Sequence, residues 1–251
     1  MFFNSFKGSI YFDIYGHGKP FLLLHGLGGT HDSMIEIAGN LDGFSVILPD
    51  LPNHGQSEDI EATMDDISEI FIDLMNYLNY EKFFVGGLSL GSLIAQNIAL
   101  RYPEKIEKLI LISPGIKIDD YAMNTVMTWF DAEDGGASTT FSKEYYEKNK
   151  NEILEYNKRF PFDPSRLAGI ASDLINFDLT GNKINVSCLS IIGDQDIIFG
   201  PRIIQDLKNI YSDCRIEIIK SGHAIHRESP RIASKLIKEF LLEKLGVWGK
   251  Q

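Results

Sequence analysis

The sequence has little positive charge. Lysine and arginine together number 24, against 35 aspartate and glutamate residues, which gives a formal net charge of −11. Nucleic acids and anionic membranes bind proteins through a basic face, because their phosphate groups need positive partners. The composition therefore argues against a nucleic acid or a membrane as a partner. It does not identify a reaction.

Long hydrophobic runs and frequent cysteines are also missing. No apolar run approaches the roughly 20 residues that a membrane helix needs. The first residues, MFFNSFKGSIYFDIYG, lack the basic flank and apolar block of a secretory signal. The two cysteines, Cys188 and Cys214, lie in apolar segments where we expect small buried thiols rather than a disulfide. These features predict a soluble protein of the cytoplasm.

What the chain does have is a regular alternation of strand and helix patterns. Its 251 residues, 44% of them hydrophobic, suit one α/β domain with an insertion. Helices are expected at about 33–41, behind a capping Thr63, after Ser89, near Pro201 and near Pro230. Strands are expected at SIYFDIY, PFLLLHG, FSVILPD, KFFVGG, KLILIS, CLSIIG and CRIEIIK. This alternation requires crossover connections, so it predicts a mostly parallel central sheet flanked by helices.

The alternation stops between residues 115 and 183. This segment has ten aromatic residues and no strand-like run. A structureless loop of that length is uncommon, so we expect several helices packed over the sheet edge. The predicted organisation is a core of residues 1–114 and 184–251 with a helical cap, residues 115–183. A single aromatic residue in the cap is most simply explained as part of its own small core, but Trp129 and Phe130 are candidate substrate contacts.

A serine stands between two glycines where a strand pattern meets a helix pattern, in FFVGGLSLGSLIAQ, residues 83–96. Glycine and serine are common in turns, so Gly-Leu-Ser-Leu-Gly alone is a weak signal. At a strand-to-helix turn, however, the serine is forced into an unfavourable backbone conformation, and the flanking glycines let the strand and helix approach. The Ser89 hydroxyl then projects at a helix N-terminus, whose free N–H groups stabilise a developing anion. The stretch predicts acyl transfer.

A nucleophilic serine needs a base, and the sequence has six histidines. His223, in IIKSGHAIHRESP, follows the last predicted strand directly and so lies at the same sheet edge as Ser89. His226 is its main rival. His25 and His54 also lie on loops at that edge, and we expect them to be polar anchors of those loops.

An acid must orient the imidazole, and two aspartates follow a predicted strand in SIIGDQDIIFGP. Either Asp194 or Asp196 can accept a hydrogen bond from the imidazole and stabilise its cation. The other aspartate is expected to form a turn or to cap a helix. The pattern alone does not decide between His223 and His226 as the base, or between Asp194 and Asp196 as the acid.

Taken together, these segments resemble the α/β-hydrolase family. HGLGG, DLPNHGQS, GLSLG, GDQD and SGHAIH occur in that family's order, and the resemblance runs from about residue 21 to residue 241. It implies an α/β-hydrolase fold with a cap at the insertion. Residue by residue, it implies Ser89 as nucleophile, Asp196 as acid and His223 as base. The backbone N–H groups of Leu27 and Leu90 become the oxyanion hole.

Two positions depart from the family pattern. Ser92 stands where a second glycine usually follows the elbow, and Asn53 stands where the second loop usually has glycine. Both departures bear on the assignment to a subfamily and leave the implied roles of Ser89, Asp196 and His223 unchanged. Serine at the elbow also argues against haloalkane dehalogenases and epoxide hydrolases, which have aspartate there.

The resemblance implies a serine hydrolase that cleaves a carboxylic ester or related small acyl substrate through an acyl-enzyme, with no metal or cofactor. One alternative is a lyase or C–C hydrolase of the same fold, because SGHAIHRESP and DLPNHGQS look like segments of the menaquinone-pathway lyase family. It ranks second, because the elbow is followed by Gly91 and Ser92 without the arginine expected nearby, and the cap is more acidic than basic. A non-catalytic receptor for a small molecule is the other alternative, since plant hormone receptors resemble this family.

Overall fold

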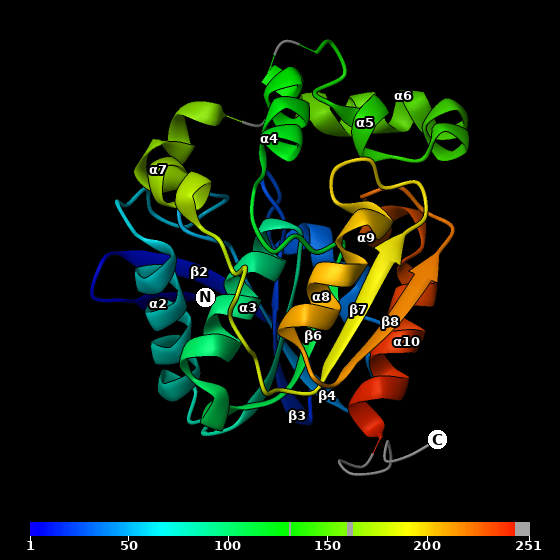
Figure 1. Cartoon of the computed structure of the whole chain (residues 1–251). Helices are drawn as coiled ribbons and strands as arrows, with labels where there is room; N and C mark the ends of the chain where they lie inside the picture. Colours follow the sequence, from blue (N-terminus) through cyan, green and yellow to red (C-terminus); the bar gives the residue numbers. More distant parts are fainter. Residues whose placement is uncertain (131, 160–162, 244–251) are drawn as a thin grey trace, which may run out of the picture.

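An eight-stranded sheet runs through the centre of the protein (Figure 1). The structure is a computed structural model that describes residues 1–130, 132–159 and 163–243. The strand order is β1-β2-β4-β3-β5-β6-β7-β8, and β2 is antiparallel to both of its neighbours, β1 and β4. All other neighbouring pairs are parallel. The strands are β1 (Phe2–Asn4), β2 (Ser9–Gly16), β3 (Lys19–Leu24), β4 (Phe44–Pro49), β5 (Phe83–Leu88), β6 (Ile106–Ile112), β7 (Cys188–Gly193) and β8 (Cys214–Ile219).

The predicted mostly parallel sheet is confirmed, and every predicted strand is present. The pattern missed β1, because three residues are too few to show a period of two. Cys188 and Cys214 are register partners on β7 and β8, and both are free cysteines.

Helices cover both faces of the sheet (Figure 1). The two faces form separate hydrophobic cores, which explains why β4, β5 and β7 are buried along their whole length and read as continuous apolar runs. One core includes side chains of α2 (Met64–Tyr77), α3 (Leu90–Arg101) and α8 (Ile204–Ile210), and the other includes side chains of α1 (Ile35–Ala38), α9 (Ile225–Glu228) and α10 (Pro230–Leu242).

The start of α2 shows how a local sequence fixes an element. The Thr63 hydroxyl accepts a hydrogen bond from the Asp66 N–H at 3.0 Å, and the Asp66 carboxylate accepts one from the Thr63 N–H at 2.9 Å. This reciprocal capping satisfies two N–H groups that the helix itself cannot pair. The cap predicted at Thr63 is therefore present.

Between β6 and β7 the described chain forms helices and no β-strand of the sheet. We call residues 120–176 the helical insertion. It lies over the end of the sheet where the parallel strands finish (Figure 1). An isolated bridge between Lys117 and Asp178 joins the two chain segments that enter and leave it. Domain limits at 115 and 183 stay a prediction. The helices are α4 (Asp120–Met127), α5 (Ala137–Thr140), α6 (Lys143–Arg159) and α7 (Ala168–Asn176).

Candidate active site

Ser89 occupies a strained turn between β5 and α3. Its backbone has φ 52° and ψ −112°, and its N–H donates to the Ile112 carbonyl at 3.0 Å. Positive φ is uncommon for a residue with a side chain and costs on the order of 1–3 kcal/mol. The surrounding strands and helix must hold the turn in place. The conformation is the one that the sequence predicted for this serine.

The glycines on either side of Ser89 are required by close backbone contacts. A Cβ atom on Gly87 would lie 2.2 Å from the carbonyl carbon and oxygen of Gly91, and one on Gly91 would lie 2.5 Å from the carbonyl oxygens of Leu24 and His25. No side chain fits at either position. Ser92, which replaces the family's second glycine, is accommodated because its hydroxyl donates to the Ser89 carbonyl at 2.6 Å.

Asp196 and His223 form a buried pair. His223 Nδ1 lies 2.8 Å from Asp196 Oδ2, while Asp196 Oδ1 accepts hydrogen bonds from the N–H groups of Ile198 at 2.8 Å and Phe199 at 3.1 Å. Burial raises the pKa of Asp196, but the imidazole and the two N–H donors outweigh it, so this pKa lies below its ordinary value. An ionised carboxylate only accepts, so Nδ1 carries the proton and Nε2 is left as the base.

Asp194 and His226, the alternatives to Asp196 and His223, have different surroundings. Asp194 is exposed, and its carboxylate accepts a hydrogen bond from the Ser221 N–H at 3.1 Å. His226 lines the same cavity as His223, but its Nδ1 has no hydrogen-bond partner in the described structure. Burial, reinforced by the charge of Arg227, lowers the pKa of His226 to about 3. His226 is therefore a neutral imidazole, and no carboxylate of the described residues orients it.

The backbone of His223 is fixed from two sides. Its N–H donates to the Thr140 carbonyl at 2.8 Å, and its carbonyl accepts a hydrogen bond from the Ser113 hydroxyl at 2.7 Å. Thr140 belongs to the helical insertion, and Ser113 follows β6 with a φ of 46°. Sequence reasoning identified neither residue. The strained Ser113 had a signal, because it is the last residue of the predicted strand KLILIS and so lies at the same sheet edge as Ser89, whereas Thr140 had none.

His25 joins two of the loops that the motifs mark. Its Nε2 accepts a hydrogen bond from the Leu51 N–H at 2.9 Å, so its Nδ1, 2.8 Å from the Gly26 carbonyl, is the donor. Burial and the neighbouring His54 lower the pKa of His25 to about 3, which keeps this ring neutral. His54 Nδ1 lies 2.9 Å from the Pro52 carbonyl. Both histidines thus have the anchoring contacts that were expected of them.

Two backbone N–H groups are available beside Ser89. Leu90 is the first residue of α3, and Leu27 follows the HG pair after β3. Within the described residues, neither N–H donates a hydrogen bond to a protein acceptor. Helix N-terminal donors are commonly satisfied by ligands. Both positions remain predicted members of an oxyanion hole.

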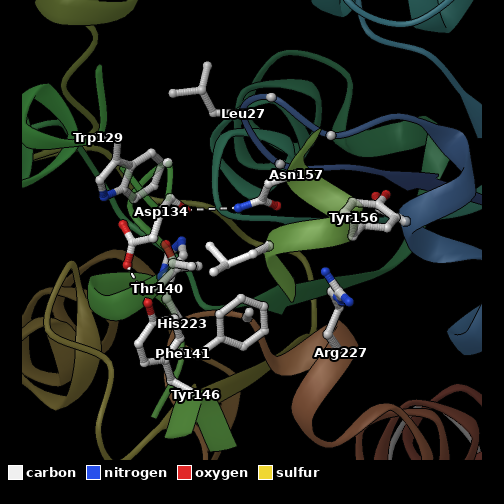
Figure 2. Close-up of a pocket in the computed structure, with 18 of the residues that line it drawn as sticks. Leu27, Trp129, Asp134, Thr140, Phe141, Tyr146, Tyr156, Asn157, His223 and Arg227 are labelled. Atoms are coloured by element: carbon white, nitrogen blue, oxygen red, sulfur yellow. Dashed lines mark hydrogen bonds between the residues drawn. The ribbon is translucent and has the colours of Figure 1, made fainter. Parts of the chain in front are cut away.

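A cavity of about 860 Å³ connects these groups with the helical insertion (Figure 2). Ser89 and His223 line it together with Trp129, whose Nε1 donates to the Thr139 hydroxyl at 2.8 Å. No hydrogen bond joins Ser89 and His223 among the described residues, and such bonds often tighten only when substrate is present. The size matches cavities that hold small molecules. The side chain of Phe130, the other predicted contact, lies outside the described residues.

Across residues 1–130, 132–159 and 163–243, no three histidine, cysteine or acidic side chains are grouped so that they could hold a metal ion. No described helix combines the length and the apolar character needed to cross a membrane.

Comparison with known proteins defines the class. The alpha/beta hydrolase fold family model matches residues 19–164, more than half of the chain, and the chain belongs to this family. Among solved structures, a thermophilic esterase from Thermogutta terrifontis superposes with a TM-score of 0.81 over 93% of both chains. Its sequence is 24% identical, so the likeness establishes the shared fold.

Two curated relatives are similar over most of their length. One, from Bacillus subtilis (strain 168), is provisionally named 2-succinyl-6-hydroxy-2,4-cyclohexadiene-1-carboxylate synthase; it is 27% identical over 87% of this chain and 88% of its own. The other, from Wigglesworthia glossinidia brevipalpis, is named pimeloyl-[acyl-carrier protein] methyl ester esterase and is 29% identical over 91% of this chain and 96% of its own. The chain is therefore similar both to an ester hydrolase and to a synthase of the same fold.

Proposed function

We propose that the protein is a cytoplasmic serine hydrolase that cleaves a carboxylic ester or a related acyl compound. One observation carries the proposal: His223, paired with the buried Asp196, lines the same cavity as Ser89, which is held in a strained turn. The esterase relative from Wigglesworthia, similar over nearly its whole length, supports an ester as the substrate.

In this mechanism Ser89 Oγ attacks the carbonyl carbon while His223 Nε2 accepts its proton. Asp196 holds the imidazole in the required tautomer and stabilises the imidazolium that forms. The N–H groups of Leu27 and Leu90 stabilise the tetrahedral oxyanion. His223 then gives the proton to the leaving alcohol, and water activated by the same histidine releases the acid from Ser89.

The direct test is turnover of a panel of neutral esters with short to long acyl chains. The native protein is expected to hydrolyse some members, and Ser89→Ala is expected to lower kcat by several orders of magnitude while remaining folded. Ser190→Ala is a matched control, because Ser190 is buried in β7 away from the cavity lining. Equal turnover by native protein and Ser89→Ala would refute the proposal.

A lyase or C–C hydrolase of the same fold is the second candidate. The synthase-named relative from Bacillus favours it, because the similarity spans 87% of this chain. Product formation from that synthase's substrate, without turnover of any ester, would select this candidate. A receptor would instead bind a small molecule tightly and convert neither substrate.

A further inference from the structure

Arg227 lies beside the catalytic pair but takes no part in the proposed mechanism. It belongs to α9, four residues after His223, and it lines the same cavity as Ser89 (Figure 2). Its guanidinium lies over the Tyr156 ring at 4.5 Å and the Phe141 ring at 5.5 Å from the ring centroids. Both aromatic residues come from the helical insertion region, so they fix the guanidinium under it.

Among the described residues, the guanidinium has only a long ion pair with an exposed carboxylate. Its side chain is only 20% exposed, and within the described structure it donates no hydrogen bond. The nearest carboxylate of the described chain, that of Glu152, lies 3.9 Å away on a side chain that is 76% exposed. Arginines that are largely removed from water are normally paired, because an uncompensated cation is costly to bury. The five N–H donors of Arg227 are therefore available to a ligand in the cavity.

The charge of the cavity lining contrasts with the charge of the whole chain. Among the described residues that line the cavity, Lys150, Lys158 and Arg227 stand against two carboxylates, those of Glu133 and Asp134, although the protein carries a net charge of −11. The Asp134 carboxylate is already occupied, accepting hydrogen bonds from the Gly136 N–H at 3.0 Å, the Ser138 N–H at 2.9 Å and the Tyr146 hydroxyl at 2.9 Å. The described lining therefore presents more positive than negative charge to an anion in the cavity.

We infer that Arg227 binds an anionic group, a carboxylate or a phosphate, that the ester substrate carries away from the reacting carbonyl. A guanidinium binds such groups through two parallel N–H donors. The resulting charge-assisted hydrogen bonds are stronger in a partly dehydrated cavity than in water. The inference rests on the proposed function and narrows its substrate class to acidic esters. The acid can belong to the acyl part or to the alcohol part, because both fit the same chemistry.

The test compares kcat/KM for matched acidic and neutral esters. On the acyl side, the monomethyl esters of glutarate and adipate are paired with methyl pentanoate and methyl hexanoate. On the alcohol side, the hexanoyl ester of glycolate is paired with ethyl hexanoate. A phosphate-bearing ester, hexanoyl glycerol phosphate, is paired with hexanoyl glycerol. In at least one of these three comparisons, kcat/KM of the native protein is expected to be about tenfold or more higher for the acidic ester than for its neutral partner. This is the usual effect of a charge-assisted hydrogen bond.

Variants at Arg227 assign that preference to its guanidinium. Arg227→Gln should reduce the ratio of acidic to neutral kcat/KM to near one, and Arg227→Lys should give an intermediate ratio. Arg231→Gln is the matched control, because Arg231 is exposed in α10 and outside the cavity lining. It should retain the native ratio. Glu152→Gln removes the competing carboxylate and should raise the ratio.

A measurement on the native protein covers the case in which Arg227→Gln does not fold. Glutarate should inhibit hydrolysis of a neutral ester competitively, its neutral diamide should not, and added salt should weaken the inhibition. Turnover of neutral esters with no acidic preference in any of the three comparisons, or a preference that survives Arg227→Gln, would overturn the inference and leave the proposed function standing. Absence of all ester turnover would overturn both.

Discussion

At the scale of single residues, the two histidines of the SGHAIH segment make a sharp comparison. His223 has the carboxylate partner that a base needs, and His226 has none among the described residues. We expect His223→Ala to lower kcat/KM about 10⁴-fold or more and His226→Ala to stay within about tenfold of the native protein. Steady-state kinetics on the best ester checks this. A larger loss in His226→Ala would show that the base has been assigned to the wrong ring.

The aspartate pair gives an independent comparison. Asp196→Asn replaces an acceptor that fixes the His223 tautomer, so the base nitrogen becomes protonated, and we expect a loss of about 10³–10⁴-fold in kcat. Asp194→Asn changes only an exposed side chain that contacts the Ser221 N–H, so kcat should remain within a few-fold of native. If both changes reduced kcat equally, the Asp196–His223 bond would not be the functional one.

The strand-end pattern predicted Ser89, one of the pair Asp194 and Asp196, and one of the pair His223 and His226, because each lies within a few residues of a strand end. The resemblance to the family then selected Asp196 and His223. Parallel strands bring their carboxyl ends to one edge, so these positions converge without knowledge of packing. Arg227 gave no comparable signal. Its surroundings depend on where Tyr156 and Glu152 of α6 come to lie, and that is decided by long-range packing of the insertion.

At the scale of elements, the insertion and the loops of the sheet build one cavity together. Trp129 contributes to its lining from the insertion, held by the bond from its Nε1 to Thr139. Trp129→Ala should change the order of preference among ester chain lengths, with severalfold changes for individual chains, rather than abolish turnover of all of them.

The exposed Tyr121 of α4 is a matched control for this change, because it is 55% exposed and outside the cavity lining. Tyr121→Ala should leave the chain-length profile unaltered. A uniform loss of activity in Trp129→Ala with a lowered midpoint of thermal unfolding would mean that Trp129 serves only the insertion's own packing.

Local patterns predicted the core elements better than the insertion. Strands of continuous apolar residues and a capped α2 follow from nearby residues. The contact of the Thr140 carbonyl with the His223 N–H joins positions far apart in the chain, and no short-range pattern encodes it. A helical insertion was predictable, whereas its attachment to the loop of His223 was not.

At the scale of the whole molecule, buried neutral histidines make stability depend on pH. The pKa values of His25 and His226 are lowered to about 3 by burial, against about 6.5 in an unfolded chain. Between these values the unfolded state binds protons that the folded state does not. The contribution of these two histidines to the free energy of unfolding is therefore fully present above about pH 6.5. It is lost as the pH falls towards 3, by at most about 1.4 kcal/mol per pH unit for each group.

Urea unfolding at a series of pH values checks this. His226→Gln should flatten the dependence, and the matched change at the exposed His17 should leave it as in the native protein. A native free energy of unfolding that stays constant from pH 7 to pH 4 would contradict the account.

The most direct test of the central claim is covalent labelling of Ser89. A fluorophosphonate probe should add once to the native protein, and peptide mass spectrometry should place the adduct on Ser89, because in the proposed mechanism His223 and the N–H groups of Leu27 and Leu90 activate this hydroxyl. Ser89→Ala should fold, as judged by its unfolding midpoint, and remain unlabelled. A native protein that binds ligand but takes up no label, or an adduct on another residue, would contradict the assignment of Ser89 as the nucleophile.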